Sequence, residues 1–162
     1  MKVSIVKVKD LRSSIKKSVD LIGGFRNFIK KGDRVLIKPN FNSDDPFPAS
    51  SDPGFIRETI GLIREAGAEE VVIGESSGPY WKPTTRTLKK TGLLKMAEEM
   101  QVEVLDFDHL PFVYKEMPKT AKYLKGLHVP ESLFKYDKLI YLPCLKTHSW
   151  ARFTLSLKLS MG

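Results

Sequence analysis

The sequence predicts an α/β fold: a mostly parallel β-sheet with helices on both faces, in a three-layer, Rossmann-like arrangement. Short apolar runs at residues 34–38, 70–74 and 102–106 have the length and composition of buried strands. The segments between them repeat apolar residues at steps of three and four, which is typical of amphipathic helices. Because neighbouring parallel strands need a long crossover, this alternation predicts a parallel sheet. The length of 162 residues fits one compact core, so residues 1–162 are expected to form a single α/β domain.

The N-terminal part is expected to hold one strand and one long helix. Lysine and serine alternate with valine and isoleucine over residues 2–8, which predicts a strand. Over residues 11–31 the apolar residues recur with helical spacing, and Asp10 is placed to cap the first turn. A glycine pair at 23–24 predicts an interruption of this helix, and Gly32 marks its end.

A long polar segment, residues 40–51, follows the first strand of the predicted sheet. It contains Asn, Asp, Pro and Ser without apolar periodicity, and loops of this length tend to be functional. Asp52 as N-cap and Pro53 at the first helical position predict a helix that ends at Gly67. A further helical region is expected over residues 84–100, with a pause at its Thr-Gly pair.

Residues 109–129 interrupt the alternation and are expected to form a small irregular β insertion. Short strands or a hairpin are predicted at 112–114 and 122–124, with prolines as punctuation around them. A short helix at 131–134 then leads to the last strand of the sheet, at 138–142. That strand is followed by a turn rich in reactive side chains.

The positive charge is concentrated at the N-terminus. The chain has 27 Lys and Arg against 19 Asp and Glu, a net charge of +8, and residues 1–38 hold 11 basic and 3 acidic side chains. Such a basic segment would attract nucleic acid or an acidic ligand. The alternative is a set of lysines on the solvated side of a strand and a helix.

Composition also bears on location and cofactors. No run approaches the roughly 18 apolar residues of a membrane span, and the first residues do not build a signal-peptide core. We therefore expect a cytoplasmic protein without a membrane partner. Cys144 is the single cysteine, so an internal disulfide is excluded, and no iron–sulfur cluster is expected within this chain.

Polar and charged side chains follow the predicted strands at their carboxyl ends. Ligands of open parallel sheets bind there, where the connecting loops converge. The residues expected to bind a ligand are Lys38, Asn40, Ser76, Ser77, Lys146 and Thr147, with Lys158 near the end of the chain. Lysines and hydroxyl groups hold anions, which predicts a small anionic or phosphate-bearing ligand. Neither a G-x-G-x-x-G nor a Walker A pattern occurs, which argues against a conventional dinucleotide or nucleoside-triphosphate site.

Two side chains are candidates for acid–base catalysis. His148 lies in a strand-to-loop turn, where it would donate a hydrogen bond or move a proton, with a capping or surface role as the alternative. Glu75 follows a strand and would act as acid or base, although carboxylates in such positions are mostly solvated or capping groups. Cys144 would be a nucleophile beside His148 or, more often, a small buried hydrophobe. Lys158 would hold an anion or form a covalent adduct, or face water.

Several segments, taken in order, resemble the family known as domain of unknown function 362. They are Lys38-Pro39-Asn40, the Asp52-Pro53 helix start, Ile73 to Gly78, Thr91-Gly92, Tyr136 to Ile140, Leu142 to His148, and Leu157-Lys158 with Gly162. The resemblance implies a relation to iron–sulfur proteins, because some members carry a ferredoxin-like domain with four-iron, four-sulfur clusters. The family usually continues with Lys-Asn and passes the glycine, whereas this chain has Lys158-Leu159 and stops at Gly162. A truncated or divergent C-terminus is therefore expected.

A more distant resemblance is to the N-terminal domain of nickel-pincer lactate racemases. It would make His148 and Lys158 the counterparts of the cofactor-binding residues there. One histidine near that lysine, and no second domain, argue against a complete nickel enzyme. The aspartates at 44, 45, 106 and 108 offer oxygen ligands for a hard cation, but no metal site is predicted.

Three functional hypotheses follow. The first is an α/β domain that binds a small anionic ligand, with a possible link to redox chemistry, at the carboxyl ends of the strands. The second is a nucleic-acid-binding module that uses the basic N-terminal third, although no scaffold with stacking aromatics accompanies it. The third is a non-catalytic partner subunit of an iron–sulfur protein.

Overall fold

The computed structural model describes residues 2–148 and 151–160, so that Gly162, part of the family resemblance, lies outside the described residues. Its centre is a four-stranded sheet with the order β3-β2-β1-β6. The strands are β1 (Arg34–Lys38), β2 (Glu70–Glu75), β3 (Val104–Asp106) and β6 (Lys138–Tyr141). All three neighbouring pairs are parallel, so the predicted α/β fold with a parallel sheet is confirmed.

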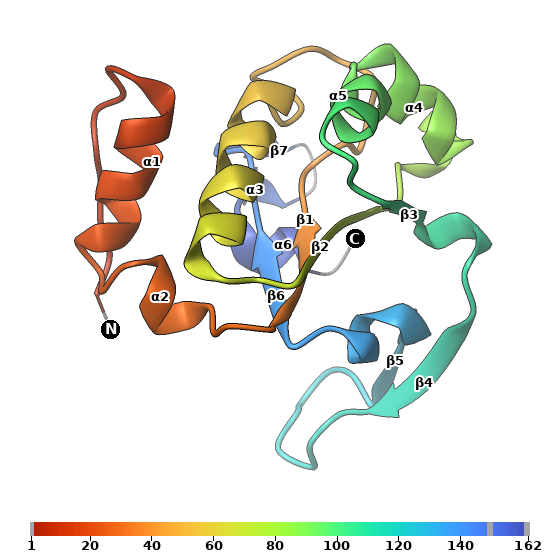
Figure 1. The fold of residues 1–162 in the computed structure, drawn as a ribbon. Coiled ribbons are helices and arrows are strands. Elements are labelled where there is room, and N and C mark those ends of the chain that lie inside the picture. The colour runs from red at the N-terminus through yellow and green to blue at the C-terminus, as the bar shows by residue number, and fades with distance from the viewer. Residues whose placement is uncertain (1, 149–150, 161–162) are drawn as a thin grey trace.

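One face of the sheet is covered by α-helices, which lie above it in Figure 1. These helices are α3 (Pro53–Ala66), α4 (Thr84–Lys90) and α5 (Leu93–Glu99). The helices pack on the side chains of β1 and β2 that face them, including Val35, Ile37 and Ile73, and together they form the main hydrophobic core. As predicted, Asp52 caps α3 by accepting a hydrogen bond from the Gly54 N–H at 2.9 Å.

The other face carries single-turn helices and a hairpin. Leu36 and Val72 of the central strands pack there against Phe107. Phe107 belongs to the 3₁₀ helix η2 (Phe107–His109), and a second 3₁₀ helix, η3 (Glu131–Lys135), lies where a short helix was predicted. The hairpin consists of β4 (Phe112–Glu116) and β5 (Gly126–Pro130), paired antiparallel over five residues of each strand. It lies below the sheet in Figure 1.

The small β insertion is confirmed, but a strand predicted within it is wrong. Residues 122–124 lie in the loop between β4 and β5 and pair with no strand among the described residues. The second strand begins instead at Gly126, opposite Glu116. A Cβ at position 126 would lie 2.3 Å from the Tyr114 ring, so the glycine allows the two strands to approach there.

The N-terminal helix is confirmed with its interruption. It is divided into α1 (Leu11–Asp20) and α2 (Phe25–Phe28), and the two glycines between them have φ values of +127° and +83°. α1 packs beside α3, where Arg12 forms ion pairs with Glu58 and Glu65.

The strand predicted over residues 2–8 is wrong. This segment is extended but pairs with no strand of the described part of the chain. It lies along α1 instead, where the Ser4 hydroxyl donates to the Ser18 carbonyl oxygen at 2.6 Å. Alternation of apolar and polar residues indicates a strand only when a sheet edge is available for pairing.

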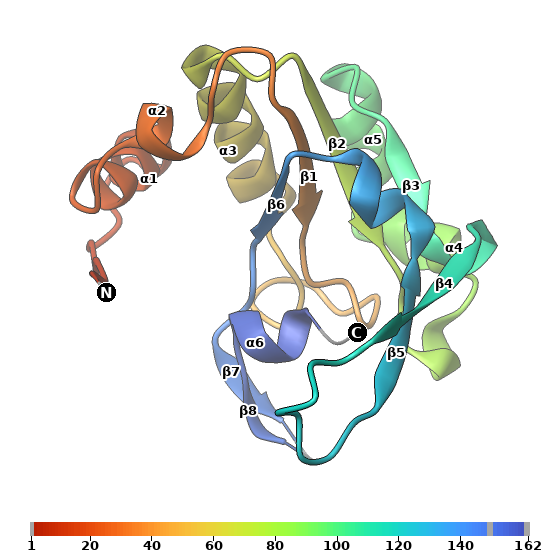
Figure 2. The ribbon, with the colours of Figure 1, turned by 90° about the horizontal axis from the view of Figure 1, so that it is seen from below.

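The segment after the sheet is more regular than the predicted turn. β7 (Lys146–His148) and β8 (Arg152–Thr154) form a second antiparallel pair, followed by the one-turn helix α6 (Ser156–Leu159). Figure 2 shows β7, β8 and α6 beyond the ends of β1 and β6, toward which these parallel strands point. Within the described residues no helix has the length and apolar character needed to cross a bilayer.

Candidate functional site

A buried ion pair lies at the carboxyl end of the central strands. The Lys38 ammonium at the end of β1 donates to Glu75 Oε1 at the end of β2, at a distance of 2.7 Å. The two side chains are only 8% and 2% exposed. The pair exists because β1 and β2 are parallel neighbours, so that residues 37 positions apart in the chain meet at one edge of the sheet.

Glu75 is held by three donors. Its Oε1 also accepts from the Ser76 N–H at 2.9 Å, and its Oε2 accepts from the Phe41 N–H at 3.0 Å. Burial raises the pKa of the Glu75 carboxyl, while the Lys38 ammonium and the backbone donors oppose this shift. The carboxylate therefore fixes the Lys38 amine and the loop that begins at Asn40.

Asp108 forms a second polar network one strand further along the sheet. The hydroxyl groups of Ser76 and Thr84 donate to its two carboxylate oxygens at 2.6 and 2.8 Å, and the Lys82 ammonium lies 2.9 Å away. Burial alone would raise the pKa of Asp108, but the donors outweigh it and hold the pKa below its ordinary value. This network orients the loop after β2.

Buried hydroxyl groups tie the loops of this edge together. The Ser77 hydroxyl donates to the Phe41 carbonyl oxygen at 2.8 Å, and the Ser51 hydroxyl donates to the Leu142 carbonyl oxygen at 3.1 Å. The backbone N–H of Asn40 donates to Ser51 Oγ at 2.9 Å. Asn40 and Ser77 are therefore buried among loop contacts, where they shape the edge of the sheet.

The other predicted site residues lie on β7 and α6. The Lys146 amine donates to the Ala49 carbonyl oxygen and so ties β7 to the loop after β1. Thr147 is exposed on the same strand, and Lys158 is exposed on α6. His148 Nδ1 accepts from the Ala151 N–H at 3.2 Å. Burial, together with the positive charges of Lys158 and Lys146, lowers the pKa of His148.

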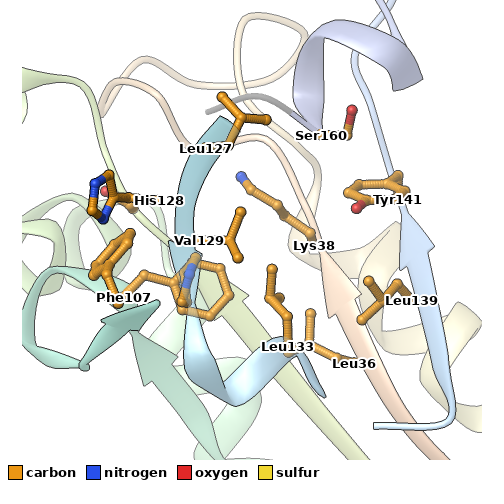
Figure 3. Close-up of a pocket in the computed structure, with 13 residues that line it drawn as sticks. Leu36, Lys38, Phe107, Leu127, His128, Val129, Leu133, Leu139, Tyr141 and Ser160 are labelled. Carbon is orange, nitrogen blue, oxygen red and sulfur yellow. The ribbon is translucent and has the colours of Figure 1, made fainter. Parts of the chain in front are cut away.

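A pocket of about 180 Å³ lies between the sheet, the hairpin, η3 and α6 (Figure 3). Lys38 extends into it from the sheet (Figure 3). Its apolar walls are Leu36, Phe107, Phe112, Leu127, Val129, Pro130, Leu133 and Leu139, and its polar lining consists of Lys38, Ser76, His128, Tyr141 and Ser160. An apolar cavity of about 150 Å³ accepts benzene, so this pocket has room for a small organic ligand.

The structure thus divides the predicted site into separate groups. Lys38 and Ser76 line the pocket, and Glu75 holds Lys38 from behind without lining it. Lys146, Thr147 and His148 form a group on β7 that is likewise not part of the pocket lining. Catalytic roles for Glu75 and His148 stay predictions.

Sequence reasoning missed the pocket residues His128, Tyr141 and Ser160. Tyr141 had a usable signal, because it follows Leu139 by two positions and so shares its face of β6. His128 had no such signal in the sequence, because it lies on β5, and the second strand of the hairpin was predicted at residues 122–124 instead. Ser160 reaches the pocket through α6, which was not predicted.

Two further observations concern potential metal ligands and the Cys144 thiol in the described part of the chain. There, no three His, Cys, Asp or Glu side chains are grouped so that they would hold a metal ion. Cys144 is half-buried, with its Sγ 3.8 Å from the Ser51 hydroxyl oxygen.

Several basic residues of the N-terminal third are engaged by carboxylates. Lys16 pairs with Asp20 and Arg34 lies 3.8 Å from Asp137, in addition to the pairs of Arg12 and Lys38. The partners of Arg12, Arg34 and Lys38 come from outside residues 1–38, so the fold places additional carboxylates beside this basic segment.

Comparisons with known proteins identify a curated relative and a matching family model. Thylakoid-associated protein sll1697 of Synechocystis sp. is 24% identical over 154 residues, which cover 94% of this chain and 46% of that protein. The chain thus spans less than half the length of this curated relative. No solved structure matches significantly. Residues 35–162 match the family described as domain of unknown function, DUF362, and this match includes all of β1 except Arg34, the pocket and β7. The chain belongs to the DUF362 family.

Proposed function

We propose that the chain binds a small ligand with one anionic group and an apolar body, in the pocket between the sheet and the hairpin. The observation that carries this proposal is the position of Lys38, whose amine is nearly buried yet belongs to the lining of an apolar pocket. An ammonium group has three donors, and one of them serves Glu75. The others are suited to a carboxylate or phosphate oxygen of the ligand.

The walls of the pocket support an apolar ligand body. Leucine, valine, proline and phenylalanine side chains surround Lys38, and the volume of about 180 Å³ suits a body the size of one aromatic ring. Binding sites for small molecules are commonly apolar, with a few polar groups that fix orientation. Here Tyr141, Ser160 and His128 would provide such groups.

Glu75 supports the site as a positioning residue. It is almost fully buried, it does not line the pocket, and it holds the Lys38 amine at 2.7 Å. Three donors fix its own orientation, which gives the amine a defined direction before a ligand arrives. Such preorganisation lowers the cost of binding.

The proposal is tested with matched probes. Benzoate, phenyl phosphate and the uncharged benzamide share one ring and differ in charge, and their binding is measured by calorimetry and by the shift of the melting temperature. We expect both anions to bind at least tenfold more tightly than benzamide. Equal binding of benzamide and benzoate would contradict a role for the Lys38 charge.

Variants connect binding to the pocket. Lys38→Met combined with Glu75→Gln removes both buried charges at nearly constant volume and is expected to abolish the preference for anions. Lys90→Gln removes a lysine that pairs with Asp44 outside the pocket and serves as the matched control. An anion preference retained by the double variant would exclude this site. Salt-dependent binding to random oligonucleotides, without binding of the small anions, would favour the nucleic-acid hypothesis.

A further inference from the structure

The hairpin β4–β5 ends in an exposed loop, residues 117–125, which we call the tip. Its base is closed by a hydrogen bond from the Met117 N–H to the Lys125 carbonyl oxygen at 2.9 Å. Inside it, the Ala121 N–H donates to the Pro118 carbonyl oxygen at 2.8 Å. The tip projects away from the sheet and lies far from α4 and α5 (Figure 1).

The tip is positively charged. Lys119, Lys122 and Lys125 are exposed, and the segment contains no acidic residue. Glu116, just before it, is the nearest carboxylate in the sequence. None of the ion pairs found among the described residues involves these three lysines. Their charges are therefore available to an external anionic partner.

The same loop exposes apolar surface. Tyr123 is 95% exposed, Leu124 45% and Met117 37%. One short loop thus exposes three large apolar side chains to water, and clustered exposed apolar surface is a common mark of an interaction site. A tyrosine ring combines an apolar body with a polar hydroxyl and is enriched where proteins meet the headgroup region of a bilayer.

We propose that the tip docks on the surface of a bilayer that contains anionic lipids. The three lysines would approach the anionic headgroups, while Tyr123 and Leu124 enter the interface between headgroups and acyl chains. Nucleic acid would satisfy the lysines and stack on one tyrosine, but it would leave Met117 and Leu124 without apolar contacts, so the bilayer is favoured. Surface docking needs no membrane-spanning helix, and it does not depend on the ligand proposed above.

The hairpin links this surface to the pocket. β5 runs from the tip directly to Leu127, His128 and Val129, which line the pocket. A tip held at a bilayer would therefore keep one wall of the pocket within a few residues of the lipid interface.

Vesicle sedimentation tests the proposal with the full chain. Phosphatidylcholine vesicles with and without phosphatidylglycerol are compared for wild type and for a variant with Lys119→Gln, Lys122→Gln and Lys125→Gln. Wild type is expected to bind only the anionic vesicles, and the triple variant to lose affinity on the order of a hundredfold, at about fivefold for each lysine. A variant with Arg86→Gln, Lys89→Gln and Lys95→Gln has the same net charge, and these exposed positions lie on α4 and α5. It should bind as wild type does.

A second measurement separates insertion from simple charge attraction. In a Cys144→Ser background, Tyr123→Cys carries an environment-sensitive fluorophore, and Thr85→Cys on α4 is the control. Anionic vesicles should shift the emission of the label at 123 to the blue and leave the label at 85 unchanged. Equal loss of binding in both triple variants, no shift at 123, or tip-dependent binding to oligonucleotides without vesicle binding would each overturn the proposal. Melting temperatures close to that of wild type confirm that the variants are folded.

Discussion

The Lys38 ammonium and the Glu75 carboxylate meet at 2.7 Å across two neighbouring parallel strands, with both side chains almost completely removed from water. The desolvation of two charges opposes folding, so a buried pair of this kind contributes little net stability even though the loss of one partner is costly. The effect of the pair is positional, because it directs an amine into a mostly apolar pocket.

Removal of Lys38 alone should therefore destabilise the protein strongly. Lys38→Met leaves the Glu75 carboxylate buried without its ammonium partner, and we expect the free energy of unfolding to fall by about 3–5 kcal/mol. Adding Glu75→Gln should recover part of this loss, since no unpaired charge then remains. Urea denaturation measures both variants, and a single variant as stable as wild type would show that the pair is not buried in solution.

Benzoate binding should strengthen as the pH falls. Burial already raises the pKa of Glu75 above its ordinary value of 4.5, and a carboxylate bound at Lys38 adds a nearby negative charge that raises it further. A ligand that raises a pKa takes up protons on binding, so its affinity increases as the pH falls toward that pKa. Calorimetry between about pH 8 and pH 5, where benzoate stays ionised, checks this trend. In Glu75→Gln this increase in affinity should be smaller over the same range.

Asp108→Asn should destabilise the protein near neutral pH and have little effect in acid. The substitution weakens hydrogen bonds from Ser76, Thr84 and Lys82, at a cost of about 1–3 kcal/mol. Because the folded pKa of Asp108 lies below its ordinary value of 3.8, the stabilisation is complete above that value and is lost as the pH falls through the folded pKa. Denaturation at a series of pH values should show the free energies of unfolding of wild type and Asp108→Asn converging as the pH falls. A constant difference at every pH would contradict this account.

Gly74→Ala should be destabilising by about 1–3 kcal/mol. A Cβ at this position of β2 would lie 2.3 Å from the ring of Phe107, so the ring would have to shift and lose part of its packing on Leu36 and Val72. Gly61→Ala is the matched control, since its Cβ would meet only the flexible end of the Arg12 side chain, whose shift disturbs no more than its surface ion pairs with Glu58 and Glu65. In thermal denaturation, the melting temperature of Gly61→Ala should be close to or above that of wild type, and that of Gly74→Ala should be well below it.

Lys158→Gln should raise the pKa of His148. Burial is the largest cause of the lowered pKa of His148, and the positive charge of Lys158 lowers it further. Neutralising that charge therefore removes one of the effects that disfavour protonation of the imidazole. Titration of the imidazole ring protons by NMR reports the change directly. Lys119→Gln on the tip should leave the titration curve of His148 unchanged. An equal shift of the His148 pKa in both variants would indicate a general charge effect.

The central sheet could be predicted because its signal is local. Each of its strands lies within a short apolar run, of which β1 and β2 are buried and β3 and β6 only partly so, and helix caps such as Asp52 mark the boundaries between them. Residues 2–8 carry a similar pattern but lack a partner edge, which no local signal reveals. The register of the hairpin was missed for a related reason: Tyr123 and Leu124 have strand-forming side chains, yet pairing starts only at Gly126.

The candidate site could be predicted only in part. Topology correctly brings Lys38 and Glu75 to the same edge, but their direct contact depends on the order of the strands, which one sequence does not specify. Ser76 and Ser77 were predicted to bind a ligand; their hydroxyl groups donate to Asp108 and to the Phe41 carbonyl oxygen, and Ser76 also lines the pocket. Polar residues after a strand serve loop structure as readily as ligands, and the sequence does not distinguish the two uses.

The order of the strands also has a consequence for how the protein assembles. β1, β2 and β3 follow one another along the sheet, whereas β6 joins β1 from far along the chain, and the Arg34 N–H donates to Asp137 across 103 residues. Closing so long a loop costs conformational entropy before the contacts between the strands can offset it, so such pairings form late and slowly. We expect the three early strands and their helices to collapse first. The pocket is complete only when β6, with Leu139 and Tyr141, has docked, so the proposed ligand binding would require the completely folded chain.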